Sequence, residues 1–246
     1  MNDFISNCLK NSKELEKYLC DASVFVTEYE DGQVYDVMVL IEDDNFINKF
    51  SFIYGPNFVV DKHVGGKDVF IRVKNYSWLE KDLSRRLPIA LWILNNSTII
   101  QEKGKKVTSM IGRYQNKFES FLEDIVRQKY LELRTERHNL RFSIRKKNND
   151  IASIIIKSTI VKLCLEICLL LEKKPYPFKV LLPRVASEES KYGKEILDIC
   201  KLFLESNDAE KSIILSDKLI KRLIDILVMD NSFPKDFLER WWLYLS

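Results

Sequence analysis

Glycine and proline are scarce in this chain, which has seven glycines and six prolines among 246 residues. Collagen-like and low-complexity chains are rich in these residues, so neither class fits. Hydrophobic residues make up 46% of the chain and charged residues 30%, which also excludes a disordered tail. A chain of this length and composition folds into one large domain or two small ones, with a sizeable hydrophobic core.

A long uncharged apolar run is also absent. The longest apolar stretch, 151–171, contains Lys157, Lys162 and Glu166. A bilayer-spanning helix rarely carries three charges, so this stretch predicts a buried helix and no membrane partner.

Cysteines are few as well: the chain has five, an odd number, scattered widely and without a recognisable signal peptide. This pattern favours reduced thiols and a cytoplasmic location over a disulfide framework. Cys164 and Cys168 lie one helical turn apart on the apolar stretch, and core packing explains them better than metal binding.

The formal net charge of +3 is unevenly distributed. Residues 103–147 contain thirteen Lys or Arg against five Asp or Glu, so this segment carries +8 and the remainder −5. A basic block of this kind is typical of a surface that meets phosphates. The solvated face of a charged helix explains it equally well, and both interpretations stay open.

Six of the seven glycines lie in the first half of the chain, and strand-like runs end near residue 101. We therefore predict an α+β protein, with a small mixed sheet and flanking helices in residues 1–105 and an all-helical bundle in residues 106–246. The expected strands are 23–29, 34–41, 68–73 and 98–101, the first two forming a hairpin at Gly32. The expected helices are 3–19, 78–95 with a break or kink at Pro88, 109–133, 140–172, 188–205, 208–229 and 235–245.

Asp36 stands in the middle of the otherwise apolar strand 34–41. Because side chains alternate along a strand, Asp36 and Met38 share one face. A buried charge is costly unless it is paired, metal-bound or exposed. Asp68 begins another strand and Glu28 ends the first hairpin strand, so both are candidates to lie beside Asp36.

The order helix, strand, glycine turn, strand with an acid, further strand with an acid and helical second half resembles the nucleotidyltransferase superfamily. The kanamycin-nucleotidyltransferase and minimal types are the most similar. In that family a Gly-Ser turn precedes a strand with Ser-Asp-x-Asp, and a third Asp lies on a neighbouring strand. The resemblance implies two Mg²⁺ ions, an NTP substrate and an activated hydroxyl nucleophile, since hard cations take oxygen ligands.

On this resemblance Tyr35-Asp36-Val37-Met38 occupies the Ser-Asp-x-Asp positions, with Met38 in place of the second Asp. Asp36 and Asp68 are then the catalytic residues and the Mg²⁺ ligands, and Thr27 and Glu28 lie at the phosphate turn. A thioether is a poor ligand for a hard cation, so the metal site is weakened unless Glu28, Glu42 or Asp43 substitutes.

The stretch Pro175-Tyr176-Pro177-Phe178-Lys179 is similar to one in the helical halves of the same relatives. It implies that Lys179 binds anionic groups of the nucleotide, together with Arg137 from the basic segment. The resulting hypothesis is a nucleotidyltransferase acting on an unidentified acceptor, or a relative that retains only nucleotide binding. The alternative is a non-catalytic module that binds nucleic acid or a protein through residues 103–147.

Overall fold

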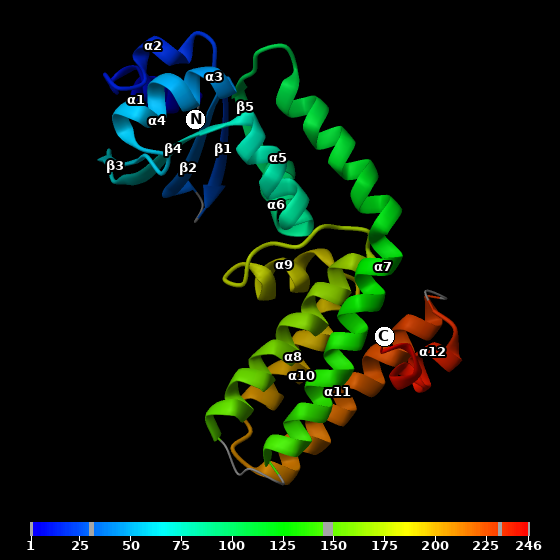
Figure 1. The fold of residues 1–246 in the computed structure, drawn as a ribbon. Coiled ribbons are helices and arrows are strands. Elements are labelled where there is room, and N and C mark those ends of the chain that lie inside the picture. The colour runs from blue at the N-terminus through cyan, green and yellow to red at the C-terminus, as the bar shows by residue number, and fades with distance from the viewer. Residues whose placement is uncertain (1, 30–31, 145–149, 231–232, 246) are drawn as a thin grey trace. The chain divides into compact units, whose positions relative to one another are not determined.

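The structure is a computed structural model that describes residues 2–29, 32–144, 150–230 and 233–245. The chain divides into two compact units, Met1–Lys117 and Phe118–Ser246. The boundary falls within the longest helix, α7 (Lys106–Phe142), which therefore contributes to both units (Figure 1).

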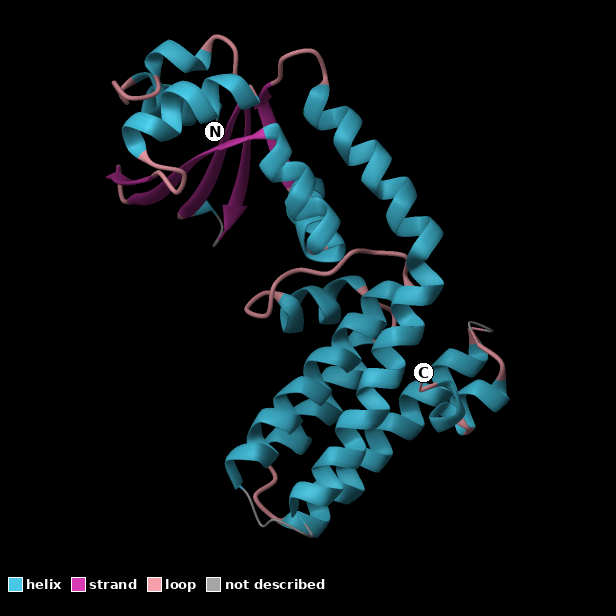
Figure 2. Ribbon diagram, in the orientation of Figure 1, coloured by secondary structure: helices cyan, strands magenta, loops and turns pink. Residues whose placement is uncertain are grey.

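The first unit is built on a five-stranded sheet in the order β3-β4-β2-β1-β5, drawn in magenta in Figure 2. Its strands are β1 (Ser23–Tyr29), β2 (Val34–Ile41), β3 (Val59–Val64), β4 (Lys67–Asn75) and β5 (Ser97–Gln101). The central pair β2 and β4 is parallel, whereas β1 pairs antiparallel with β2 and β5, and β3 pairs antiparallel with β4. The predicted β1–β2 hairpin and the mixed sheet are confirmed.

Seven short helices accompany this sheet. They are α1 (Asn2–Lys10), α2 (Glu16–Leu19), α3 (Asp43–Asn45), the π-helix η2 (Phe46–Phe50), α4 (Ser51–Tyr54), α5 (Tyr76–Arg85) and α6 (Leu87–Asn95) among the described residues. The predicted break near Pro88 is confirmed, because α5 ends before Arg86 and Pro88 lies in the first turn of α6.

The single helix predicted over 3–19 is wrong, since α1 and α2 are separate. The Cys8 carbonyl accepts bonds from the Ser12 hydroxyl (3.2 Å) and from Lys62 Nζ (3.0 Å) of β3. The Ser12 amide instead donates to the Leu9 carbonyl, so the α-helical ladder ends there.

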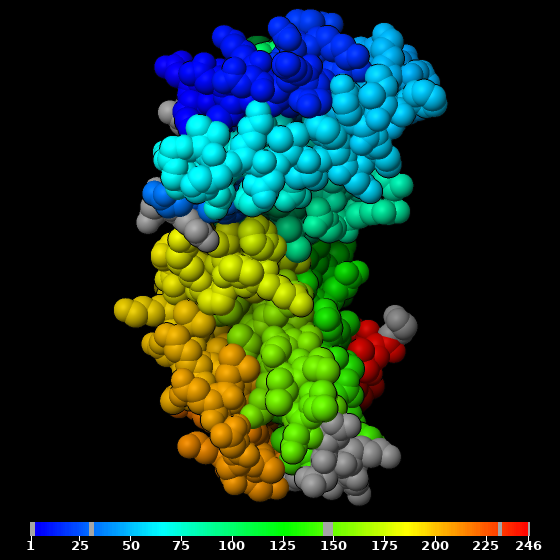
Figure 3. All heavy atoms as spheres, turned by 90° about the vertical axis from the view of Figure 1, so that its left-hand side faces the viewer, coloured from blue at the N-terminus to red at the C-terminus, as the bar shows by residue number. Residues whose placement is uncertain are grey.

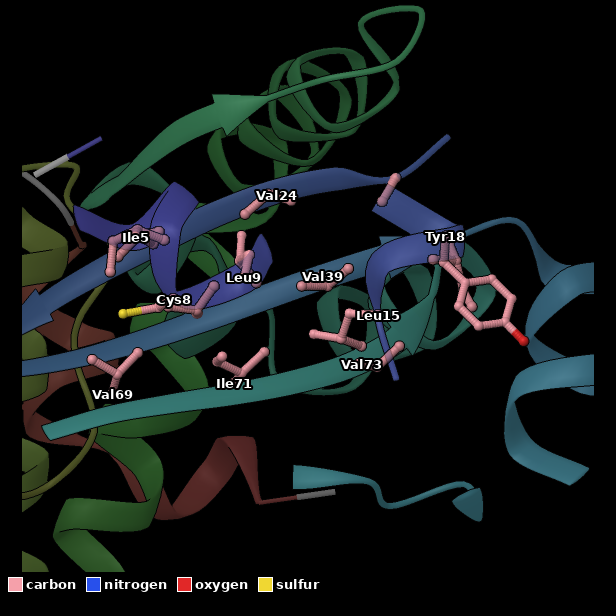
Figure 4. Packing of buried hydrophobic residues seen from close by; sticks show 14 of the residues in the cluster. Ile5, Cys8, Leu9, Leu15, Tyr18, Val24, Val39, Val69, Ile71 and Val73 are labelled. Carbon is pink, nitrogen blue, oxygen red and sulfur yellow. The ribbon is translucent and has the colours of Figure 1, made fainter. Parts of the chain in front are cut away.

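One hydrophobic core cluster of the first unit lies on one face of the sheet. Alternate residues of β2, Tyr35, Val37, Val39 and Ile41, are buried on this face together with Val69, Ile71 and Val73 of β4. Helices α1 and α2 cover them, and Figure 4 shows Ile5, Cys8 and Leu9 lying against the strands that carry Val39 and Ile71. The other face of the sheet therefore carries Asp36.

The second unit is all-helical, as predicted. Beyond α7 its elements are α8 (Asp150–Leu171), α9 (Leu182–Glu189), α10 (Gly193–Glu205), α11 (Ala209–Met229), α12 (Lys235–Glu239) and the 3₁₀ turn η4 (Trp241–Tyr244). Asp208 caps α11 by accepting a bond from the Lys211 amide (2.6 Å).

Several predicted helix boundaries in this unit are wrong. The helix expected over 140–172 begins at Asp150 as α8, and residues 140–142 belong to α7. The helix expected over 235–245 is α12 followed by the 3₁₀ turn η4. The helix expected to end at Leu133 continues to Phe142, because Arg134, Arg137 and Arg141 all find partners on other helices. The helix expected over 188–205 is two helices, α9 and α10. A side chain at Gly193 would place its Cβ 1.7 Å from the Ala186 carbonyl oxygen, so the two helices meet closely at this glycine.

Charged residues inside α8 are satisfied by tertiary contacts. Lys157 is buried and donates to the Ser206 carbonyl at 2.6 Å, and Glu166 pairs with Lys129 at 2.7 Å and Lys162 at 3.0 Å. Among the helices described, none has the length and apolar character needed to cross a membrane. The prediction of a buried helix is confirmed for most residues of α8 from Ile160 to Leu170, whereas Ile151, Ile154 and Ile155 near its start are exposed.

Candidate functional site

We define the Asp36 face as the side of the sheet that carries Thr27 and Tyr29 of β1, Asp36 and Met38 of β2, Phe70 and Arg72 of β4, and Ser97 of β5. Strand register fixes this set, because Asp36 is opposite Thr27 on one side and Phe70 on the other. Met38 is likewise opposite Arg72, and Thr27 is opposite Ser97. Strand alternation thus places acid, base and hydroxyl groups on one face.

Asp36 lies beside the guanidinium group of Arg72. Asp36 Oδ1 is 3.2 Å from Arg72 Nε, and the two side chains are 23% and 48% exposed. The contact is an ion pair without hydrogen-bond geometry, since Oδ1 is buried and accepts no hydrogen bond. Burial raises the pKa of Asp36, and the positive charge of Arg72 opposes this shift.

Two hydroxyl groups lie on this face beside Asp36, that of Thr27 on the neighbouring strand β1 and that of Ser97 on β5. Ser97 donates to the Ile93 carbonyl at 2.6 Å, and its Oγ is 2.7 Å from Thr27 Oγ1. A hydroxyl has one proton, so Thr27 is the donor in this pair. Burial, followed by the negative charge of Asp36, raises the pKa of Tyr29.

The residues predicted for the phosphate turn, Thr27 and Glu28, both belong to β1. Thr27 is buried on the Asp36 face, whereas Glu28 is exposed and alternates to the opposite face. The structure therefore separates these two residues.

Asp68 shares a face with Asp36 but has a different partner. It is opposite Val34, two residues before Asp36 on β2. Its Oδ1 lies 2.7 Å from His63 Nδ1 of the edge strand β3, with both side chains largely exposed. Asp36 and Asp68 thus lie on the same side of the sheet, and each is paired with a separate basic residue.

The residues at Asp36 do not fit a two-magnesium site. Met38 brings a buried thioether where a second carboxylate is needed, and Arg72 already places a positive charge beside Asp36. A divalent cation requires several oxygen ligands and is repelled by a guanidinium group. Within the described parts of the chain, no three His, Cys, Asp or Glu side chains are grouped to hold a metal ion.

Two of the substitutes considered for Met38, Glu42 and Asp43, are engaged elsewhere, and the third, Glu28, is on the opposite face of the sheet. Glu42 pairs with Lys106 at 2.6 Å, and Asp43 accepts bonds from the amide and hydroxyl of Ser77. These contacts fix both acids near the starts of α7 and α5.

Lys179 and Arg137 belong to the second unit. Arg137 donates from Nε to Asp217 Oδ1 at 2.6 Å, and Arg141 binds the other oxygen of Asp217 at 2.7 Å. Lys179 is exposed, forms no ion pair with a described residue, and lines a groove of this unit.

Most of the positive charge of the basic segment is compensated within the protein. Seven of its ten described Lys and Arg residues form ion pairs with carboxylates: Lys103, Lys106, Arg113, Arg127, Lys129, Arg137 and Arg141. Arg134 binds the Leu238 carbonyl at 3.1 Å and the Tyr130 hydroxyl at 2.7 Å. The described part of the segment is therefore mostly a charged helix paired with its own protein.

Arg72, the partner of Asp36, was not predicted from the sequence. A signal was present, because alternation along the strand 68–73 puts Arg72 on the same face as Asp68. Parallel pairing of that strand with 34–41 was the additional information needed to bring Arg72 to Asp36.

No family model and no curated protein sequence matches this chain significantly. A solved structure does: a nucleotidyltransferase-like protein from Exiguobacterium sibiricum 255-15, with a TM-score of 0.52 and 12% sequence identity. The alignment covers 95% of this chain and 76% of that protein. The mixed sheet and helical second half therefore form a nucleotidyltransferase-like α+β fold.

Proposed function

We propose that this protein is a nucleotide-binding member of the nucleotidyltransferase-like fold that does not carry out metal-dependent nucleotidyl transfer. The fold supports the general class. The observation that carries the finer proposal is the ion pair of Asp36 with Arg72, formed where Met38 replaces a second carboxylate. Arg72 supplies beside Asp36 a fixed positive charge in place of a metal ion.

Arg72 and Lys74 support binding of phosphate groups. Both lie on the Asp36 face of β4, and the positive charge of Arg72 contributes to lowering the pKa of Lys74, after burial. Lys74 Nζ is oriented by the Pro56 carbonyl at 2.7 Å and by Asn57 Oδ1 at 3.0 Å. A bound polyanion relieves the repulsion between the two cations, and a half-exposed guanidinium group suits bidentate contact with phosphate.

The proposal assigns Asp36 the role of holding Arg72 when no nucleotide is bound. Asp36 and a phosphate group compete for the same guanidinium group, so neutralising Asp36 favours phosphate binding. If Asp36 were a metal ligand, neutralising it would have the opposite effect and abolish binding of the metal and its triphosphate.

Calorimetric titration with ATP, GTP and CTP, with Mg²⁺ and with EDTA, tests the proposal. We expect binding that persists in EDTA, a loss of about ten-fold or more in R72A, and undiminished affinity in D36N. R85A is the matched control, because Arg85 is an exposed arginine of the same unit without a described ion-pair partner.

Three results would contradict the proposal that the protein does not catalyse metal-dependent nucleotidyl transfer. They are a strict requirement for Mg²⁺, loss of nucleotide binding in D36N, and pyrophosphate release with any acceptor. Absence of heat with every nucleotide would contradict nucleotide binding itself. The alternative, nucleic-acid or protein binding through residues 103–147, has less support because most described cations there are paired.

A further inference from the structure

A groove lies on the second unit, bordered by α8, the segment before α9, α9 itself and the end of α10. We call it the α8–α9 groove, and it has a volume of about 420 Å³. In Figure 3 these segments adjoin on the visible face, with α8 in yellow-green below the yellow segment and beside α10 in orange. Its aliphatic walls consist of Ile154, Ile155, Val161, Leu165, Leu182 and Leu204.

The hydroxyl groups in these walls are already engaged. Ser158 donates to the Ile154 carbonyl and Thr159 to the Ile155 carbonyl, each at 3.0 Å along the same helix. The groove thus offers an incoming ligand a predominantly apolar surface. Ile154 and Ile155 are 64% and 61% exposed, which leaves a large apolar area in contact with water.

The charge at the groove is positive. Lys162 and Lys179 line it, and none of the described lining residues is acidic. Lys162 shares the buried carboxylate of Glu166 with Lys129, so two ammonium groups are balanced by one negative charge. Lys179 has no described ion-pair partner, and the groove therefore has an excess of positive charge.

We propose that the α8–α9 groove binds a small amphiphile with an aliphatic body and a single anionic head, such as a medium-chain carboxylate. The volume of the groove is in the range of small-molecule sites. Its apolar walls suit an aliphatic body, and its two lysines suit an anionic head. No aromatic side chain lines the groove among the described residues, so a nucleobase finds no ring to stack on.

Calorimetric titration of the full-length protein with octanoate, decanoate and dodecanoate tests the site. Each added methylene that is buried should raise the affinity about four-fold until the groove is filled. Decyltrimethylammonium has a body of the same length with a cationic head, and should bind markedly more weakly than decanoate.

Variants locate the site. I155D should weaken decanoate binding about ten-fold or more, because it places a charge in the apolar wall. I214D is its control, since Ile214 is 64% exposed on α11 and does not line the groove. K179E should weaken decanoate binding about five-fold. Its control is K221E, at an exposed lysine on α11, which should not weaken binding.

Absence of saturable heat with decanoate, equal binding of the cationic amphiphile, or equal effects of I155D and I214D would overturn the proposal. A concentration-dependent dimer that I155D dissociates would assign the groove to contact between copies instead. Competition between ATP and decanoate would assign it to the nucleotide. R72A should leave decanoate binding unchanged, so failure of this site and failure of the proposed function are distinguishable.

Discussion

Replacement of Arg72 by methionine should destabilise the protein at neutral pH and leave it nearly unchanged near pH 3. Methionine retains much of the apolar stem that covers the sheet and removes the charge beside Asp36. Removing one partner leaves a partly buried carboxylate without its ion pair, which costs more than the pair itself contributes.

The size of this destabilisation depends on how exposed the two side chains are. Breaking a fully buried pair costs about 3–5 kcal/mol, and an exposed pair contributes about 0.2–1 kcal/mol. Asp36 is 23% exposed and Arg72 48%, so this pair lies nearer the exposed limit. We expect R72M to lower the free energy of unfolding by about 1–2 kcal/mol at pH 7.5.

The pH dependence follows from the raised pKa of Asp36. The folded state binds the proton of Asp36 more tightly than the unfolded state, so ionisation of this group lowers stability as pH rises. Removing Arg72 raises that pKa further. Because the unfolded state of Asp36 is the same in both proteins, the extra loss in R72M should develop as pH rises through the raised pKa of Asp36 and be absent where Asp36 is protonated in both folded proteins.

Urea unfolding followed by circular dichroism at pH 3.5 and 7.5 measures this effect; urea is preferable because guanidinium ions would replace the missing side chain. The control is the double-mutant cycle with D36N, in which R72M should cost little. An equal loss at both pH values, or an equal loss in the D36N background, would refute the Asp36–Arg72 interaction as its cause.

Two further predictions concern packing and thiol reactivity. G193A should lose about 1–3 kcal/mol or more of stability, because its Cβ would collide with the Ala186 carbonyl. G112A on α7 has open space around its Cβ and should gain up to about 1 kcal/mol of stability. Thermal unfolding that shows stability changes of the same sign in both variants would contradict this. At pH 8 a disulfide reagent should react rapidly with Cys20 alone, since it is exposed and the other four thiols are buried. Burial raises the pKa of Cys200 to about 12, which leaves almost no thiolate to react. Two or more fast thiols in the native protein would exclude this packing, and urea should expose all five.

The strands were predictable where local signals were strong. The hairpin with Gly32 and the strand 68–73 are rich in β-branched and aromatic residues and lie next to glycines, and they appear as β1, β2 and β4. Helix ends were less predictable. The end of α1 depends on Lys62, which is fifty residues away from Ser12 and binds the carbonyl that would continue the helix.

The candidate site was predictable only in part. A partly buried acid at position 36 follows from strand alternation alone, and it must be paired, metal-bound or exposed. Asp36 is paired because of β4: the parallel contact of β4 with β2 sets Arg72 opposite Met38 and within reach of Asp36. Strand order is a non-local property, and the spacing of residues along the chain does not encode it directly.

The α+β character, the acid inside an apolar strand and the basic, helical second half can all be read from the order of residues along the chain. Those features arise from the periodicity of neighbouring residues, which fixes local backbone structure and the faces of each element. Which charges form ion pairs depends on the three-dimensional fold, which brings Arg72 to Asp36, Arg137 to Asp217 and Lys129 to Glu166. Electrostatic energy depends on distance and burial in space, so residues far apart in the sequence decide whether a carboxylate holds a metal ion or an arginine.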